Sequence, residues 1–266
     1  MNALYILISI LFFGILIIVH EAGHFMTAKR CGIRVSEFSV GMGPLILSKE
    51  KGETQYSWRA IPIGGYCAMG EDEGQSDDPR AFVNAPVWKK FLVLVAGSVN
   101  NFILGFLIVL ILVIVWNIGK AGAWVIVRHS WNVTIDMCKL IWESLGMIVN
   151  GEAGINDLTG PVGIVDVMTD MAEEASTVAD AFSNLAYFGA FVAVNLAMMN
   201  LLPIPALDGG RIFLLLVTAV IEKITKKKLD PKYEGYIHMA GMILLLSLMA
   251  YVMFHDIFRI IFNLGY

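Results

Sequence analysis

A pentapeptide that can bind a metal lies inside an apolar run long enough to cross a membrane. The segment Ile15–Phe25 reads ILIIVHEAGHF and contains His20-Glu21-Ala22-Gly23-His24. Histidines at positions 20 and 24 share one face of a helix, so their imidazoles can bind one zinc ion. Ionisable side chains in such a run usually serve a function, whereas a lone histidine there is more often a packing residue. The pattern therefore predicts hydrolysis at a metal within the bilayer.

The composition extends the membrane interpretation to the whole chain. Of 266 residues, 57% are hydrophobic and 16% are charged, whereas a soluble domain averages about 45–50% apolar and about 25% charged. A membrane helix needs roughly 20 apolar residues. The runs near this length are Tyr5–Val19, Phe91–Trp116, Ala181–Leu202 and Ile237–Phe254. We therefore expect an all-α polytopic membrane protein with four transmembrane helices.

The third apolar stretch is predicted to be a broken helix. It runs from Ala181 to Glu222, about twice the length of a normal crossing, and Pro203-Ile-Pro-Ala-Leu-Asp-Gly-Gly-Arg211 interrupts it. The prolines remove amide donors, and the glycines release the backbone. Unwound chain at membrane depth is tolerated only where it is buried in protein or lines a wet cavity.

Asp208 lies in this break and is the candidate for a third metal ligand. A catalytic zinc ion takes three protein ligands and leaves one position for water. With two neutral histidines and one carboxylate the site stays positively charged, which lowers the pKa of a bound water to about 7. Glu21 would then act as the general base. The alternative is that Asp208 caps the helix that follows; we favour the ligand, with one zinc ion per chain.

Residues 32–70, between the first two helices, are predicted to form a small membrane-associated β-hairpin or sheet. Gly32–Val40 and Gln55–Ile61 alternate in part, and Gly41–Pro44 has the composition of a turn. The stretch Lys29–Lys90 holds nine Lys or Arg residues, and Lys223–Lys232 holds five. Because positively charged loops stay in the cytosol, we expect the hairpin on the cytosolic side and both termini outside.

These features divide the chain into three parts. Residues 1–116 hold the first two helices and the hairpin region, residues 117–180 form an extracytoplasmic segment, and residues 181–266 hold the third and fourth helices. In the second part, apolar residues recur at three- and four-residue steps, which predicts an amphipathic helix. This helix either lies at the outer surface, anchored by Trp131 and Trp142, or packs on the other spans.

Five ordered stretches of the chain resemble the motifs of the site-2 proteases, a family of zinc-dependent intramembrane endopeptidases. They are HEAGH at 20–24, FSVGMGP with IPIGGY at 38–66, AGSVNNF at 96–102, LTGPVGI at 158–164 and NLAMMNLLPIPALDGG at 195–210. The bacterial proteases that regulate sigma factors are the most similar group. The resemblance implies that His20, His24 and Asp208 bind zinc and that Glu21 is catalytic. Ser98 stands where the family usually has proline.

The resemblance also implies how a substrate would bind. A transmembrane helix must be unwound before it is cut, and an exposed strand edge can hold the unwound segment. Gly41, Met42 and Gly43 are the candidate edge, with an ordinary turn as the alternative. By the family resemblance, the cleft would be shaped by four residues of the third stretch; the alternative for its two asparagines is hydrogen bonding between helices. They are Asn195, Asn200, Pro203 and Pro205.

The resemblance further implies the cellular setting. We expect a multi-pass protein of the bacterial cytoplasmic membrane that cuts single-span membrane proteins, of the anti-sigma-factor or remnant-signal-peptide type, and binds no nucleic acid. The group with the LTGPVGI motif usually carries a PDZ domain between its second and third spans. Residues 117–180 are too few for such a domain, so either this member lacks it or the chain has been shortened near Lys120–Ala123.

Two other classes of protein fit parts of the pattern. A transporter or channel could use a broken helix and acids at membrane depth, although the chain shows no inverted repeat. A non-catalytic relative could bind substrates without cutting them, but the intact Glu21 argues against it. His129, His238 and His255 have no partner at ligand spacing and are interpreted as structural or interfacial.

Overall fold

The computed structural model describes residues 3–69, 76–116, 121–152, 154, 160–226 and 232–262. Lys227 and Lys228 of the basic stretch Lys223–Lys232 lie outside the described residues. The chain forms two compact units, which are described separately. The first comprises Met1–Phe12, Phe102–Met198 and Leu244–Tyr266, and the second comprises Phe13–Asn101 and Met199–Ile243.

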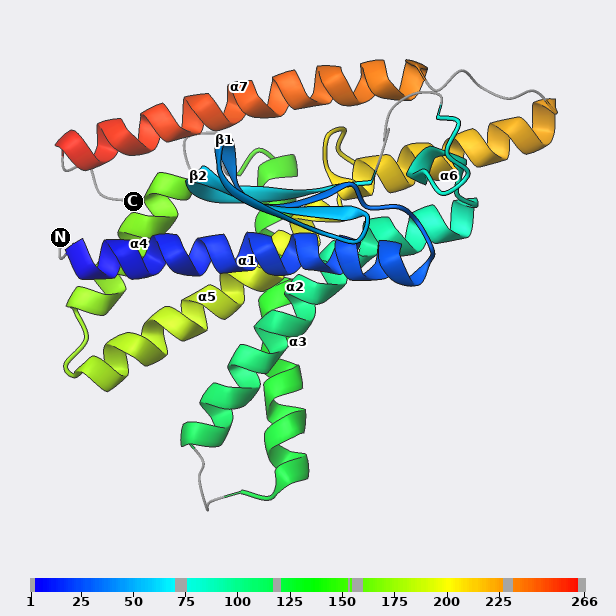
Figure 1. Cartoon of the computed structure of the whole chain (residues 1–266). Coiled ribbons are helices and arrows are strands. Elements are labelled where there is room, and N and C mark those ends of the chain that lie inside the picture. Colours follow the sequence, from blue (N-terminus) through cyan, green and yellow to red (C-terminus); the bar gives the residue numbers. More distant parts are fainter. Residues whose placement is uncertain are drawn as a thin grey trace. The chain divides into compact units, whose positions relative to one another are not determined.

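Four helices among the described residues are long and apolar enough to cross a membrane, as the sequence predicts (Figure 1). They are α1 (Ala3–Arg30), α2 (Val87–Trp116), α5 (Val178–Asn200) and α7 (Lys232–Phe262). The third stretch is broken, because α5 ends at Asn200 and α6 (Asp208–Thr225) begins after the non-helical segment 201–207. The remaining helices are α3 (Ala123–Val149), α4 (Pro161–Glu173) and the short 3-10 helix η1 (Phe82–Asn84).

The sheet is an antiparallel hairpin of two long strands, β1 (Glu37–Lys51) and β2 (Thr54–Ala68). Lys51 pairs with Thr54, so the turn lies at positions 52 and 53. The predicted turn at Gly41–Pro44 is wrong, because this segment lies inside β1. Gly41 and Gly43 have φ angles of +82° and +81° there, and the register shifts around them. Such a bulge bends a strand without ending it.

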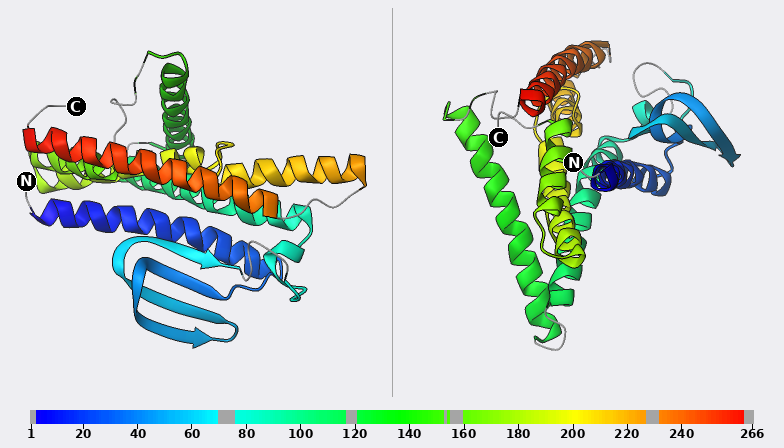
Figure 2. Two further views of the ribbon diagram at one scale, coloured as in Figure 1. Left: turned by 90° about the horizontal axis from the view of Figure 1, so that it is seen from above. Right: turned by 90° about the vertical axis from the view of Figure 1, so that its left-hand side faces the viewer.

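The bend gives the first four residues of β1 partners on both sides. Glu37–Val40 pair with Gln55–Trp58 and also with Gly65–Ala68. Among the pairings of β1 and β2, the segment Gly65–Ala68 has a partner on one side only, so it is an edge of the sheet. Figure 2 shows the hairpin beside the C-terminal half of α1.

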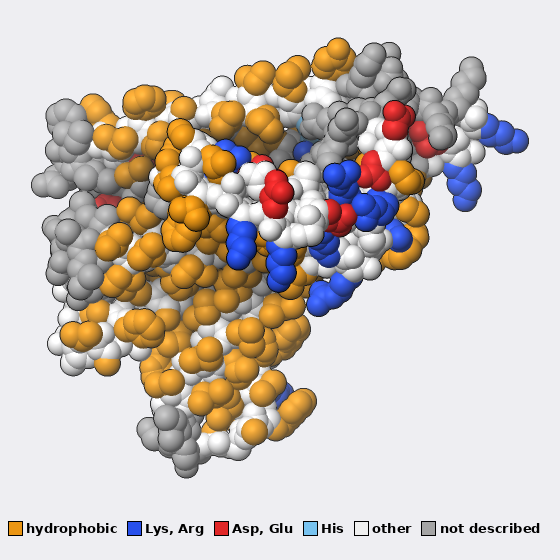
Figure 3. Space-filling model, in the orientation of Figure 1, with side chains coloured by type: hydrophobic (Ala, Val, Ile, Leu, Met, Phe, Trp, Pro, Cys, Tyr) orange, Lys and Arg blue, Asp and Glu red, His pale blue; other side chains and the backbone are white. Residues whose placement is uncertain are grey.

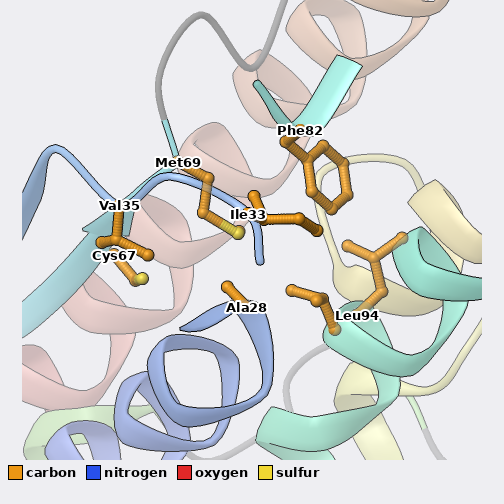
Figure 4. Close-up of a cluster of buried hydrophobic side chains, with 8 residues drawn as sticks. Ala28, Ile33, Val35, Cys67, Met69, Phe82 and Leu94 are labelled. Carbon is orange, nitrogen blue, oxygen red and sulfur yellow. The ribbon is translucent and has the colours of Figure 1, made fainter. Parts of the chain in front are cut away.

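A buried cluster in the second unit fixes the hairpin to the end of α1 and to α2 (Figure 4). Its members come from α1, from the chain after it, from the end of β2 and the residue that follows, from η1 and from the start of α2. They are Ala28, Ile33, Val35, Cys67, Met69, Phe82, Val93 and Leu94. Burying one large aliphatic or aromatic side chain contributes about 1.5–3 kcal/mol. The cluster therefore holds the edge Gly65–Ala68 close to the helix that carries the pentapeptide.

Charged side chains of the second unit gather over the hairpin and the segment that follows it (Figure 3). Glu53 in the hairpin turn lies 2.8 Å from Lys29 Nζ and 2.9 Å from Arg80, and Arg34 lies 3.1 Å from Asp78. Exposed ion pairs of this kind contribute little stability each. They give this part of the surface of the second unit a polar character.

In the first unit, one face of α3 packs against α2 and α5. Its buried residues are Ser130, Thr134, Met137 and Ile141. The latter two join a cluster with Val109 and Val113 of α2 and with Ala190 and Val194 of α5. The Trp131 ring contacts Phe102 and Phe106, with centroids 5.9 Å away in each case. This geometry favours packing on the other spans over a position at the outer surface alone.

A buried carboxylate on α7 caps α4 in the first unit. Asp256 is fully buried, and its Oδ2 accepts hydrogen bonds from the backbone N–H groups of Gly160 (2.9 Å) and Gly163 (3.0 Å). Gly160 is the N-cap residue of α4 and has no side chain with which to cap the helix. A carboxylate is the favoured group at a helix N-terminus, so Asp256 supplies the cap from a distant part of the chain.

We expect Asp256→Ala to lower the free energy of unfolding by about 2–5 kcal/mol, because two buried N–H groups lose their acceptor. Thermal unfolding of the purified protein in detergent measures the effect. Asp170→Ala, which removes an exposed carboxylate from the same helix α4, is the matched control. Equal melting temperatures for the two variants would contradict the capping role.

Candidate metal centre

His20 and His24 lie on one face of α1, and both are buried. Their Nε2 atoms are 3.1 Å apart. The Nδ1 of His24 donates a hydrogen bond to the backbone carbonyl of Val93 at 2.8 Å, which places the proton on Nδ1 and leaves Nε2 with its lone pair. Histidines that bind a metal through one ring nitrogen typically donate a hydrogen bond from the other ring nitrogen, as His24 does here.

Asp208 is the first residue of α6 and points at both histidines. Its Oδ2 lies 3.0 Å from His20 Nε2 and 3.3 Å from His24 Nε2. Leu207 occupies the N-cap position of α6, and no side chain caps this end. The geometry therefore favours the ligand interpretation of Asp208 over the helix cap.

The three ligand atoms fit a zinc ion. Around tetrahedral zinc with bonds of about 2.0–2.1 Å, neighbouring ligand atoms are about 3.3–3.4 Å apart, and the observed separations of 3.0–3.3 Å are close to this. Asp208 Oδ2 is a buried atom without a well-formed hydrogen bond among the described residues. Two imidazole lone pairs and a carboxylate oxygen converge here, and a divalent cation satisfies all three at once.

Glu21 sits between the two histidines and faces the edge of the sheet. The backbone N–H of Cys67 contributes a hydrogen bond to its carboxylate. At Gly65 an added Cβ would lie 3.7 Å from Glu21 Cγ. Glu21 is thus positioned by α1 on one side and by the edge Gly65–Ala68 on the other.

Gly97 on α2 makes room for the histidines. A Cβ at this position would lie 2.5 Å from His24 Nε2 and 2.7 Å from His20 Cε1. A Cβ at Gly23 of α1 would likewise lie 2.5 Å from the carbonyl oxygen of Ala96. The close approach of α1 and α2 at this depth therefore depends on glycine in both helices.

The hairpin beside the site is held by its own polar contacts. Arg59 donates to Glu37 at 2.8 Å and to the carbonyl of Gly43 at 2.9 Å, which ties the bulge to the start of β1. Partial burial alone would raise the pKa of Glu37, but hydrogen bonds from Ser57, Arg59 and Tyr66 hold it below its usual value. These contacts fix the shape of the strand that pairs with the edge.

The other residues predicted for substrate binding are only partly placed at the centre. Asn200 ends α5, and Pro203 and Pro205 lie in the segment that leads to Asp208. Gly41, Met42 and Gly43 form a bulge of β1, where Met42 pairs with Ile61, and their role as the edge that holds a substrate stays a prediction. Asn195 belongs to the first unit, so its role in binding a substrate stays a prediction.

Three groups that contact the histidines or the loop before Asp208 were not predicted from the sequence. They are Gly97, the carbonyl of Val93 and His238. Gly97 lies in the AGSVNNF motif, which could have indicated that the position is important. The motif does not indicate that Gly97 lies against the two histidines. His238 is buried, and its Nδ1 accepts a hydrogen bond from the backbone of Ala206; nothing in its spacing indicated this partner.

Helices of membrane length, a His-Glu-x-x-His helix and a carboxylate on a second element define a class, the membrane metalloproteases with one zinc site. Comparison with known proteins agrees. The profile of peptidase family M50 matches residues 8–248. The chain belongs to this family, the site-2 proteases, and it is a multi-pass membrane protein and a zinc metalloendopeptidase.

Individual relatives are similar over nearly the whole chain. A protein named as a zinc metalloprotease in Clostridium acetobutylicum is 33% identical, with 95% of this chain and 97% of the relative covered. The regulator of sigma-W protease of Bacillus subtilis is 24% identical, with 94% and 97% covered. The first alignment is 338 positions long although the chain has 266 residues, so the relative has insertions without a counterpart here.

We expect Gly97→Ala to weaken zinc binding by about 10–100-fold, because the methyl group displaces the imidazoles from their ligand geometry. Zinc per chain, measured by atomic absorption after dialysis against a weak chelator, tests this. Gly146→Ala on α3 is the control, since its Cβ would meet nothing within 4 Å. Full zinc content in the Gly97 variant would refute the proposed crowding.

Proposed function

We propose that this protein cuts transmembrane segments of single-span membrane proteins at a zinc ion bound by His20, His24 and Asp208. The observation that carries the proposal is the convergence of their three ligand atoms at 3.0–3.3 Å, with both histidines on a helix long and apolar enough to cross a membrane. Zinc, when bound, supplies the positive charge that activates water and polarises the scissile carbonyl.

Glu21 performs the proton transfers. Its carboxylate accepts a proton from the attacking water, and the remaining hydroxide oxygen adds to the carbonyl carbon of the peptide bond. The same proton then passes to the nitrogen of the leaving amine as the C–N bond breaks, so that Glu21 ends the cycle as a carboxylate. The Cys67 amide, which bonds to this carboxylate, keeps it oriented throughout.

The edge Gly65–Ala68 is the part of the hairpin best suited to hold an extended substrate. In the pairing of β1 with β2 it lies at a border of the sheet, and it lies beside Glu21. Adding the substrate as a further strand would replace the hydrogen bonds that its helix loses. The bulge at Gly41–Gly43 acts indirectly, since it bends β1 so that Glu37–Val40 can pair with this edge.

The setting follows from charge and from the relatives. The basic segments support a topology with the hairpin and the metal centre toward the cytosol and both termini outside a bacterial cytoplasmic membrane. A relative named as a regulator of sigma-W supports substrates of the anti-sigma-factor type, with remnant signal peptides as a second source. The insertions in the relatives support the proposal that this chain has no PDZ domain.

We expect Glu21→Gln to keep zinc and to lose cleavage, with a rate at least about 100-fold lower, because general base catalysis contributes about 10²–10⁴. A model single-span substrate in mixed micelles, analysed by gel and mass spectrometry, gives the rate. Glu50→Gln on the exposed part of β1 is the matched control. A glutamine variant that cuts normally would end the assignment, whereas zinc loss in that variant would make Glu21 a ligand.

Cleavage should depend on how easily the substrate helix unwinds. Two Leu→Gly changes next to the cut site destabilise that helix by about 2 kcal/mol, which corresponds to about 30-fold faster cleavage if unwinding precedes chemistry. Two Leu→Ala changes, which preserve helix propensity, are the control. Equal rates for both substrates would show that binding requires no unwinding.

A further inference from the structure

The loop before Asp208 contains a residue in a backbone conformation that L-amino acids with a side chain rarely adopt. Ala206 has a φ angle of +78° although it is not glycine. Such outliers persist only where their surroundings hold them in place, and they are most frequent at functional sites. Ala206 lies two residues before Asp208, so this angle sets the direction in which the chain enters α6.

His238 of α7 is the side chain that holds this conformation. It is 7% exposed, and its Nδ1 accepts a hydrogen bond of 3.3 Å from the backbone N–H of Ala206. An acceptor at Nδ1 requires the proton on Nε2, so the imidazole acts here as a neutral acceptor. A polar side chain in an otherwise apolar helix is costly unless it has a partner of this kind.

The neighbouring turn of α7 fits the same loop. Gly241, three residues after His238 and therefore on the same helix face, lies directly against Pro205; a Cβ there would overlap the proline ring. Within the loop, Leu207 N–H bonds to the carbonyl of Ile204 at 3.2 Å, which closes a tight turn around Ala206. Helix α7 thus supports the loop by one hydrogen bond and one close contact.

We propose that His238 is a positioning residue of the metal centre: its imidazole holds Ala206 in the left-handed conformation that brings the Asp208 carboxylate to His20 and His24. The proposal rests on the ligand role of Asp208 proposed above. It gives α7, which carries none of the three proposed ligands, an indirect part in metal binding.

The test compares two replacements of His238 in the full chain, purified in detergent. Asparagine places its carbonyl oxygen near the position of Nδ1 and can still accept the Ala206 N–H, whereas leucine has similar bulk and no acceptor. We expect His238→Leu to bind zinc about tenfold more weakly, as for one lost hydrogen bond, and His238→Asn to bind it within about threefold of the original chain. Competition with a chelator measures the affinity.

The absorption spectrum of the cobalt-substituted protein separates positioning from general stability. A displaced Asp208 alters the ligand field, so the cobalt bands of His238→Leu should shift, while those of His238→Asn should not. Ala206→Gly provides a second readout, because glycine adopts a positive φ at no steric cost. Adding it to His238→Leu should restore most of the zinc affinity and the original cobalt spectrum.

The outcomes are separable. Unchanged zinc affinity and cobalt bands in His238→Leu, equal loss in His238→Asn, or no rescue by Ala206→Gly would each overturn the positioning role. If the leucine variant does not fold, His238→Gln replaces it. The glutamine carbonyl reaches the position of Nε2 instead of Nδ1, so the protein with His238→Gln should bind zinc more weakly than the protein with His238→Asn. The zinc affinity of Asp208→Ala is measured in the same experiment. If this variant binds zinc as tightly as the original chain, the ligand role of Asp208 is wrong, independently of the results for His238.

Discussion

Two imidazoles and one carboxylate meet within an apolar helical framework, and the rest of the structure depends on this contact. Buried polar groups at membrane depth are costly unless they are paired, and a cation is the partner that satisfies three electron-pair donors together. The separations of 3.0–3.3 Å leave the space that a zinc ion requires. Every nearby element is shaped to allow this convergence.

Two kinds of backbone adaptation make the convergence possible. Where α1 and α2 approach, Gly23 and Gly97 leave out the side chains that would collide with Ala96 and with the histidines. Where the third stretch breaks, the segment 201–207 lets Asp208 start a new helix directly opposite them. The unusual φ angle of Ala206 is the local cost of that arrangement, and α7 offsets it through His238.

The hairpin connects the metal centre with the chemistry of a peptide substrate. Its core, from Ala28 to Leu94, holds the edge Gly65–Ala68 beside Glu21. A strand can add an unwound chain as a further strand only if it lies at the border of its sheet and is held in place. The border position comes from the pairing of β1 and β2, and the buried cluster shared with α1 and α2 holds the segment in place.

The sequence by itself determined the four apolar helices, the break in the third and the identity of the candidate ligands, because helix length, proline chemistry and the spacing of His20 and His24 are local properties. The sequence pattern predicted the hairpin turn at the wrong place, because glycine-rich segments occur both at bulges and at turns. Only the tertiary structure decided that the edge is Gly65–Ala68, that Gly97 touches the ligands and that His238 bonds to Ala206. These are contacts between distant segments, and no local pattern encodes which segments meet.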